Sequence, residues 1–533
     1  MAIASAFDIL GPVMVGPSSS HTAGALRIAR LAAGLCPGRV AHVKFTLYNS
    51  FARTHEGHGT DRALVAGILG MDADDPRIRD SFDVARDAGL EWDFAYADAA
   101  SGQGLHPNTV DVSMTDAEGG VTSARGESIG GGRARLVSVN GVAVTLTGDM
   151  HTLFVAHRDV PGMLAMMTAA LGNAGVNIAH MSSYRTTPGE LAYAVFEMDS
   201  EPSDVVVNYV SAAPDVFSAT LVRRIGSAAP AAASSPLEFS SGQELLSLCR
   251  DRGASIGQVM RDRERDLRGE EQTRAMAVRV RDVMRAETGE PLAHPGQTLG
   301  GMIGGNAARF QSAPDPLLDP TLHRAASYAM ATLERSASMG VIVAAPTAGA
   351  SGVLPGSLLA CSEKLGAGDE EVELALFCAA AVGALIERGA SVAGAEGGCQ
   401  AEVGTAAAMS AAALAQLMGA EPARCLDAAT IAIGNLLGLV CDPVRGLVEV
   451  PCQARNVIGV SDAMTAAQMA MGGITLPTSF DDAVRAMRDV GHSLPEALRE
   501  TALGGFAAAP SSNDPAWIKA RAVAACEGCG GCE

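Results

Sequence analysis

Three of the eleven cysteines in this chain stand in contexts that suit metal ligands. Cys399 lies in AEGGCQAE, where two glycines free the backbone to curl around a ligand, and Cys441 lies in VCDPVRG. Cys452 directly follows Pro451 in EVPCQARN. All three are expected in loops or at helix ends, as are the thiolate ligands of a metal cluster, and free backbone N–H groups there favour the thiolate form. Spacing alone leaves inert thiols as an alternative of equal weight.

The remaining cysteines have settings that favour other roles. Cys361, Cys378 and Cys425 lie within or at the edges of apolar helical runs, where a free cysteine is usually a small hydrophobe. Cys36, before Pro37, and Cys249, before an Arg-rich stretch, are also expected to be inert. The C-x₂-C spacing occurs only in the tail CEGCGGCE, at Cys526, Cys529 and Cys532. The spacing therefore predicts no zinc finger.

The string GPSSSHTAG (16–24) has the pattern of a helix start that could bind an anion. A Gly-Pro turn and three serines before an apolar run form an N-cap signature. Serine hydroxyls, free N–H groups and the helix dipole suit a substrate carboxylate. The candidate residues are Ser18, Ser19, Ser20, His21 and Thr22. The alternative is a simple capping run, in which His21 is only a first-turn residue.

Two glycine-rich loops stand beside predicted helices, GMIGGNAARF (301–310) and PTAGASG (346–352). Their amides could cradle a cluster or a carboxylate, which makes candidates of Gly304, Gly305, Thr347, Gly349 and Ser351. Because glycine also permits close helix packing, a purely structural role is the alternative.

Four strings together resemble the iron–sulfur L-serine dehydratases: GPSSSHTAG, APTAGASGVLPG (345–356), GAEGGCQAEVG (394–404) and CDPVRGLVEVPCQARN (441–456). The resemblance implies a [4Fe–4S] cluster held by Cys399, Cys441 and Cys452, with the fourth iron open to substrate. Many relatives carry a further cysteine where this chain has Ser351, which leaves the local contacts there undefined.

The implied reaction is the α,β-elimination of water from L-serine, giving pyruvate and ammonia, with the open iron as Lewis acid on the substrate hydroxyl. The resemblance also places the THEGHGTD loop (54–61) near substrate, so His58 is the candidate for proton transfer or orientation. A surface-loop histidine is the alternative. Cys532 is a candidate fourth ligand of the cluster in the resting state of the enzyme. The alternative is that the C-terminal tail is disordered. The rival functions are a cysteine desulfidase and a non-catalytic amino-acid sensor.

Three parts must position these residues. Residues 1–148 mix short β-rich runs with helices and predict an α/β domain, and residues 241–533 predict an all-helical catalytic domain. Residues 149–225 show the order βαββαβ, which is a ferredoxin-like module. The Ala/Ser/Pro-rich segment 226–240 is expected to be a linker.

The strings AHRDVPGML and GVNIAHMSS in the middle part resemble an ACT domain, the sensing module of amino-acid metabolism. The resemblance implies effector-binding loops around Asp159, Gly162 and Asn177, with serine or another amino acid as effector. It also implies at least a homodimer, since ACT modules generally pair.

Composition excludes several function classes. With 59 acidic against 39 basic residues the formal charge is −20, which disfavours nucleic-acid and membrane-surface partners. Only three lysines occur, Lys44, Lys364 and Lys519, and none has a setting suited to a Schiff base, so no pyridoxal phosphate is expected.

The long apolar runs at 374–386 and 403–420 predict buried helices, since both fall short of a membrane span. A cytoplasmic protein acting on a small molecule is expected.

Overall fold

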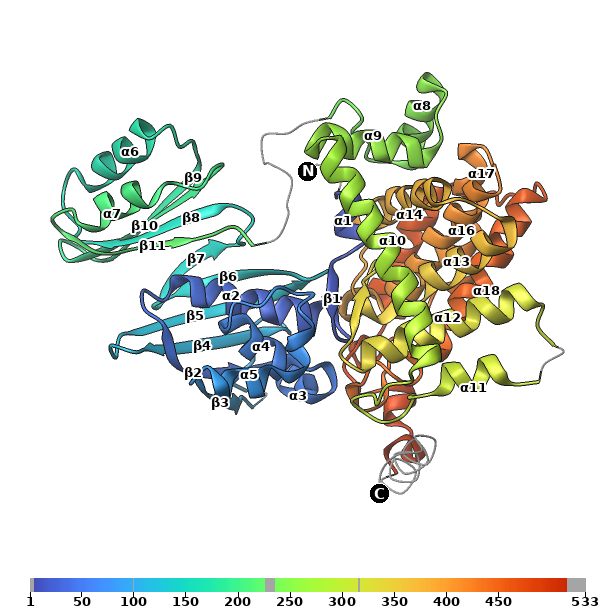
Figure 1. The fold of residues 1–533 in the computed structure, drawn as a ribbon, viewed down its shortest axis with the longest axis horizontal. Coiled ribbons are helices and arrows are strands. Elements are labelled where there is room, and N and C mark those ends of the chain that lie inside the picture. Colours follow the sequence, from blue (N-terminus) through green and yellow to red (C-terminus); the bar gives the residue numbers. More distant parts are fainter. Residues whose placement is uncertain (1–3, 99, 226–234, 315–316, 515–533) are drawn as a thin grey trace.

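The computed structural model describes residues 4–98, 100–225, 235–314 and 317–514. Figure 1 shows three parts: a sheet-rich N-terminal domain, a small domain with a sheet under two helices, and a large helical part. The predicted architecture, an α/β domain, a ferredoxin-like domain and a helical domain, is confirmed.

The N-terminal domain is a six-stranded sheet of order β3-β2-β4-β5-β6-β7, in which only the β2–β3 pair is parallel. Alternate residues of β5 are buried, as expected of a sheet with one face on a core. Helix α2 packs on β5, β6 and α4. The elements are β2 (Val40–Leu47), β3 (Glu91–Tyr96), β4 (Thr109–Asp116), β5 (Val121–Gly130), β6 (Arg133–Val139), β7 (Val142–Leu146), α2 (Ala25–Leu35), α3 (Asn49–His58), α4 (Thr60–Ile68) and α5 (Ser81–Asp87).

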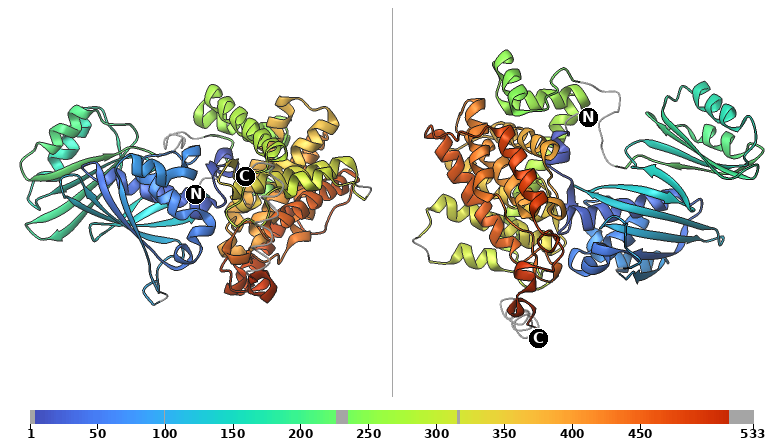
Figure 2. Two further views of the ribbon diagram at one scale, coloured as in Figure 1. Left: turned by 60° about the horizontal axis from the view of Figure 1, so that its bottom comes forward. Right: turned by 180° about the vertical axis from the view of Figure 1, so that it is seen from behind.

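The ACT domain has the predicted βαββαβ order and an antiparallel sheet of order β11-β8-β10-β9. Both faces of β8 are buried: Leu153 and Val155 join the domain's own core, whereas Phe154 and Ala156 join the core of the N-terminal domain. This explains the unbroken apolar run TLFVA. The elements are β8 (His151–His157), α6 (Met163–Asn173), β9 (Ile178–Thr187), β10 (Leu191–Met198), α7 (Asp204–Ser211) and β11 (Val216–Val222). Figure 2 shows this domain on the N-terminal domain and apart from the large helical part.

The helical part is built around two Ala-rich helices: α14, which includes the predicted buried run 374–386, and α16, which lies within the run 403–420. Small side chains let α16 pack against α13, α14, α17 and α18 at once. None of the described helices is both long and apolar enough to cross a membrane. The helices are α8 (Gly242–Arg252), α9 (Ile256–Arg268), α10 (Glu270–Ala293), α11 (Asn306–Ser312), α12 (Pro320–Ala337), α13 (Val353–Leu365), α14 (Asp369–Gly389), α15 (Gly394–Gly397), α16 (Thr405–Leu417), α17 (Pro422–Leu436), α18 (Cys452–Met471) and α19 (Phe480–Ser493).

The first described residues depart from the expected division, because they belong to the helical part and not to the α/β domain. Helix α1 (Ala6–Ile9) is buried in the helical core, and Gly383 leaves the space that Ile9 fills. Strand β1 (Val13–Val15) then pairs antiparallel with β12 (Val341–Val343) of the helical part. The chain enters the N-terminal domain only after this pairing.

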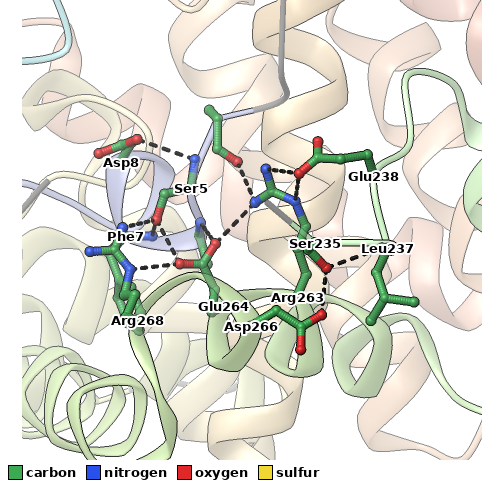
Figure 3. A network of polar contacts seen from close by, with 12 residues as sticks. Ser5, Phe7, Asp8, Ser235, Leu237, Glu238, Arg263, Glu264, Asp266 and Arg268 are labelled. Atoms are coloured by element: carbon green, nitrogen blue, oxygen red, sulfur yellow. Dashed lines mark hydrogen bonds and ion pairs between the residues drawn. The ribbon is translucent and has the colours of Figure 1, made fainter. Parts of the chain in front are cut away.

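A buried ionic network anchors this N-terminal segment (Figure 3). The carboxylate of Glu264 accepts hydrogen bonds from the backbone N–H of Ala6 at 2.9 Å and from the Ser5 hydroxyl at 2.8 Å. It also pairs with Arg263 at 3.1 Å and Arg268 at 2.9 Å. The side chain of Glu264 is fully buried and those of both arginines are 2% exposed. A charge this deep is tolerated only because opposite charges and donors surround it.

Removing the charge of Glu264 is expected to destabilise the protein strongly. Glu264→Gln leaves two buried guanidinium groups without their shared carboxylate, and such losses cost about 3–5 kcal/mol. The matched control is Glu270→Gln, which removes a carboxylate paired with Arg265 at 2.6 Å but 63% exposed, and should cost under about 1 kcal/mol. Chemical denaturation of both variants checks the difference, and equal losses would contradict it.

Candidate active site

A cavity of about 300 Å³ lies where the N-terminal domain meets the helical part. Its lining comes from both. The N-terminal domain contributes Ser18, Ser19, Ser20, His106, Asn108 and Ser128. The helical part contributes Thr347, Gly349, Cys399, Glu402, Cys441, Cys452, Arg455 and Glu500.

The three candidate cysteines share the helical wall of this cavity although the chain separates them widely. Cys399 precedes a short π-helical turn, η4 (Gln400–Gly404), Cys441 lies in the loop after α17, and Cys452 is the first residue of α18. Gly398 has a φ of +73°, and a Cβ there would meet Leu439 O at 2.9 Å, so the glycine before Cys399 is required by its conformation.

Burial keeps all three thiols protonated in the absence of a cation. Burial, and next the charge of Glu402, raises the pKa of Cys399 to about 12. The pKa values of Cys441 and Cys452 are also raised well above normal, first by burial and then by the neighbouring carboxylates and thiols. In the described residues, no group of three or more His, Cys, Asp or Glu side chains could hold a single metal ion as it stands.

The serine run forms the opposite wall as a capped turn. Ser18 is the N-cap of a π-helical turn, η1 (Ser19–Gly24), and accepts a hydrogen bond from His21 N at 3.0 Å, as the capping pattern predicts. Ser20 Oγ lies 3.0 Å from His21 Nδ1, and His21 Nε2 lies 2.9 Å from Ser50 Oγ. The turn therefore presents Ser18, Ser19 and Ser20 to the cavity, with the His21 ring behind them.

His58 does not line the cavity, and its setting corrects the expected loop. Residues 49–68 form two helices, α3 and α4, joined at Gly59, whose φ is +61°. His58 is buried behind the serine turn: its carbonyl accepts from Thr22 Oγ1 at 2.7 Å, and its ring centroid lies 4.4 Å from that of His21. Neither ring nitrogen has a hydrogen-bond partner among the described residues. Burial lowers the pKa of His58 to about 4, so the ring is neutral at pH 7.

Of the two glycine-rich loops, only the one at 346–352 lines the cavity. Thr347 and Gly349 line the cavity, and Thr347 Oγ1 donates to Glu402 Oε1 at 2.7 Å. Ser351 is buried and donates to Ala348 O at 2.8 Å instead of facing the cavity.

Gly304 and Gly305 do not line the cavity. The amide of Gly305 donates to Glu334 at 3.0 Å. In the same loop, Glu449 accepts from the amides of Gly300 at 2.6 Å and Met302 at 2.8 Å. The loop therefore does not contribute to this cavity, and the amides of Gly300, Met302 and Gly305 bind buried carboxylates of the protein.

Sequence reasoning missed four charged residues that line the cavity: Glu396, Glu402, Arg455 and Glu500. The first three lie inside the motif strings that carry the family resemblance, and that position could have identified them. No local pattern marks Glu500. Burial, and next the charge of Glu402, raises the pKa of Glu500 to about 8. Arg455 pairs with Asp442 at 2.7 Å. The cavity thus gathers thiols and carboxylates around one guanidinium group.

The remaining candidates lie outside the cavity. In the ACT domain, Asp159 pairs with Arg185 at 2.8 Å, Gly162 caps α6 with a φ of +95°, and Asn177 donates to Asp199 at 2.6 Å. Cys532 lies outside the described residues.

Together the fold and the cavity are those of an enzyme that carries an ACT domain and a thiol-lined site between two other domains. Residues 251–507 match the family "Serine dehydratase alpha chain", residues 5–136 match "Serine dehydratase beta chain" and residues 151–208 match the ACT domain. The chain is 32% identical over 523 residues to the L-serine dehydratase of Streptomyces coelicolor, covering 95% of this chain and 99% of that protein.

Two Bacillus subtilis proteins resemble the separate parts. The probable L-serine dehydratase alpha chain is 47% identical over 217 residues, covering 40% of this chain and 72% of that protein. The probable beta chain is 37% identical over 222 residues, covering 42% of this chain and 99% of that protein. The chain described here therefore belongs to the L-serine dehydratase family, with both parts and an ACT domain in one polypeptide.

The setting of His58 predicts a specific pH dependence. Unfolded, this histidine takes up a proton near its usual pKa of 6.5, but folded only near 4. Between these two pH values the unfolded state therefore binds more protons than the folded state. The contribution of neutral His58 to the free energy of unfolding, about 3 kcal/mol, is present above pH 6.5 and lost as the pH falls toward 4. His58→Phe should match the wild type in thermal stability at pH 7 and lose less stability at pH 5. If the variant unfolds more readily than the wild type at pH 7, the claim that the His58 ring makes no hydrogen bond is contradicted.

Proposed function

We propose that this protein deaminates L-serine to pyruvate and ammonia by α,β-elimination, with a [4Fe–4S] cluster as its cofactor. One observation carries the proposal: three cysteines distant in sequence share one wall of a cavity whose other wall is the serine turn. The names of the relatives support the substrate.

The thiols fit a cluster in number and setting. Burial, and after it the neighbouring charged groups, raises the pKa of each thiol, and the positive charge of bound iron would lower the cost of their ionisation. Because each thiolate of a cluster binds a different iron, the ligands do not have to converge on one point. Cys399, Cys441 and Cys452 would hold three irons of such a cluster, and a fourth iron without a protein ligand would supply Lewis-acid activation of the serine C3 hydroxyl.

The protein's own groups then orient the substrate. The hydroxyls of Ser19 and Ser20, at the start of η1, suit its carboxylate. Glu402 and Glu500 line the cavity beside the cysteines. Burial raises the pKa of both carboxyl groups, so a bound ammonium group would favour their ionised forms and be held by them. Loss of the Cα proton and the C3 hydroxyl gives aminoacrylate, which tautomerises and hydrolyses to pyruvate and ammonia.

The test is an anaerobic preparation of the whole chain, assayed for pyruvate and ammonia from L-serine alongside its iron content and visible spectrum. Pyruvate formation with bound iron supports the proposal. Sulfide from L-cysteine without pyruvate from L-serine would establish a desulfidase, and ligand binding without turnover would establish a sensor.

Each cavity cysteine should be essential. Changing Cys399, Cys441 or Cys452 singly to Ala is expected to abolish pyruvate formation and to lower bound iron, because each thiolate holds one iron. Cys361→Ala, in a helix away from the cavity, is the control and should retain both. Full activity in any one of the three variants rejects that residue as a ligand.

The serine turn can be tested by separating binding from stability. Ser19→Ala and Ser20→Ala should raise KM for L-serine about tenfold, a loss of about 1.4 kcal/mol of binding, with little change in melting temperature, since both residues line the cavity and neither caps the turn. Ser18→Ala should also cost about 1 kcal/mol of stability, because Ser18 caps the turn. Unchanged kinetics in all three variants would assign the serines to capping alone.

A further inference from the structure

Each of the three cavity cysteines is followed directly by a buried polar residue. These residues are Gln400, Asp442 and Gln453, which are 1%, 2% and 5% exposed. Buried polar side chains are retained only where their hydrogen bonds are satisfied. Each of the three bonds to elements remote from its own cysteine.

Gln400 joins the Cys399 turn to two other segments. Its side-chain oxygen accepts from Gly438 N at 2.8 Å, and its side-chain nitrogen donates to Met487 O, in α19, at 2.8 Å. Its backbone N–H donates to Leu439 O at 2.9 Å. The Cys399 turn is thereby tied to the strip of chain that leads into Cys441.

Asp442 joins the Cys441 loop to two other segments. One carboxylate oxygen pairs with Arg455 at 2.7 Å, and Arg455 lies one turn into the helix that Cys452 begins. The other accepts from Phe506 N at 2.7 Å. A Cβ on Gly505, whose φ is +58°, would collide with this carboxylate, so the 505–506 turn is shaped around Asp442.

Gln453 ties the third cysteine to the helices behind it. Its oxygen accepts from Asn306 Nδ2 at 2.8 Å, and its nitrogen donates to Met330 O at 3.2 Å and Glu334 Oε1 at 3.1 Å. These partners lie in α11 and α12.

The residues after the inert cysteines behave differently. Arg250, after Cys249, bonds to Ser247 within its own helix, and Ser362, after Cys361, bonds to Leu359 within its own. Ala379 and Leu426, after Cys378 and Cys425, carry no polar side chain. Anchoring to remote elements therefore distinguishes the residues that follow the cavity cysteines.

We propose that Gln400, Asp442 and Gln453 are positioning residues, which hold three separate backbones so that the cysteine thiols keep the spacing a cluster requires. The inference rests on the proposed function, since it assumes that these thiols bind iron. None of the three residues needs to touch iron or substrate. Partners that orient metal ligands in this way typically change metal affinity about 10- to 100-fold when they are removed.

The test compares two glutamines with the same bonds. Gln416 accepts from Gly257 N at 2.8 Å and donates to Leu374 O at 2.9 Å, away from the cysteines, and so matches Gln400. Wild type, Gln400→Met and Gln416→Met are reconstituted anaerobically with iron and sulfide. Iron per chain and the rate of iron loss to a chelator are measured, with the melting temperature of the cluster-free protein.

Both variants are expected to melt lower than the wild type, but only Gln400→Met should lose iron faster, by about tenfold or more. Equal rates of iron loss in the two variants would overturn the proposal. If Gln400→Met does not fold, Asp442→Asn decides, because it keeps an acceptor for Phe506 N while removing the ion pair with Arg455. It should lose iron faster than Asp427→Asn, which removes the Arg424 pair at 3.2 Å. A wild type that takes up no iron would instead overturn the proposed cofactor, and this inference with it.

Discussion

The short pairing of β1 with β12 is the constraint on which the cavity depends. Three residue pairs, from Val13 with Val343 to Val15 with Val341, join the N-terminal segment to the helical part. Hydrogen bonds from Gly16 N to Gly340 O and from Ala344 N to Pro12 O extend the ladder at both ends. Strand β1 leads directly into the serine turn and β12 into the loop of Thr347 and Gly349, so one ladder places parts of both cavity walls.

Buried carboxylates hold the segments that this ladder leaves free. Glu264 binds Ser5 and Ala6, Glu287 accepts from Val343 N at 2.7 Å on β12, and Glu334 and Glu449 bind the loop at 300–307. Burial raises the pKa of Glu287 well above normal and that of Glu334 to about 7. Carboxylates so placed add little net stability, but each accepts only one arrangement of backbone donors. They therefore favour one geometry of the loops around the cavity.

Much of the architecture could be predicted because its signals are local. The ACT order follows from helix punctuation and alternating apolar runs, and the buried helices α14 and α16 follow from their Ala-rich, uncharged runs. The setting of each cysteine was equally local, since glycines or a proline beside it mark a turn or a helix end. By contrast, nothing local distinguishes a glycine loop around a ligand from one around a buried carboxylate, so the sequence could not show that Gly304 and Gly305 lie outside the cavity or that Gly305 binds Glu334.

By itself the sequence determined the element order, the family motifs and which cysteines stand at turns, because each depends on residues within a few positions of one another. Only the tertiary structure decided that residues 6–10 pack in the helical core, that His58 lies behind the serine turn, and that Glu402 and Glu500 line the cavity. These placements depend on contacts between segments tens to hundreds of residues apart. Such contacts are selected by the joint packing of the whole chain, which leaves no periodic or compositional trace at either partner.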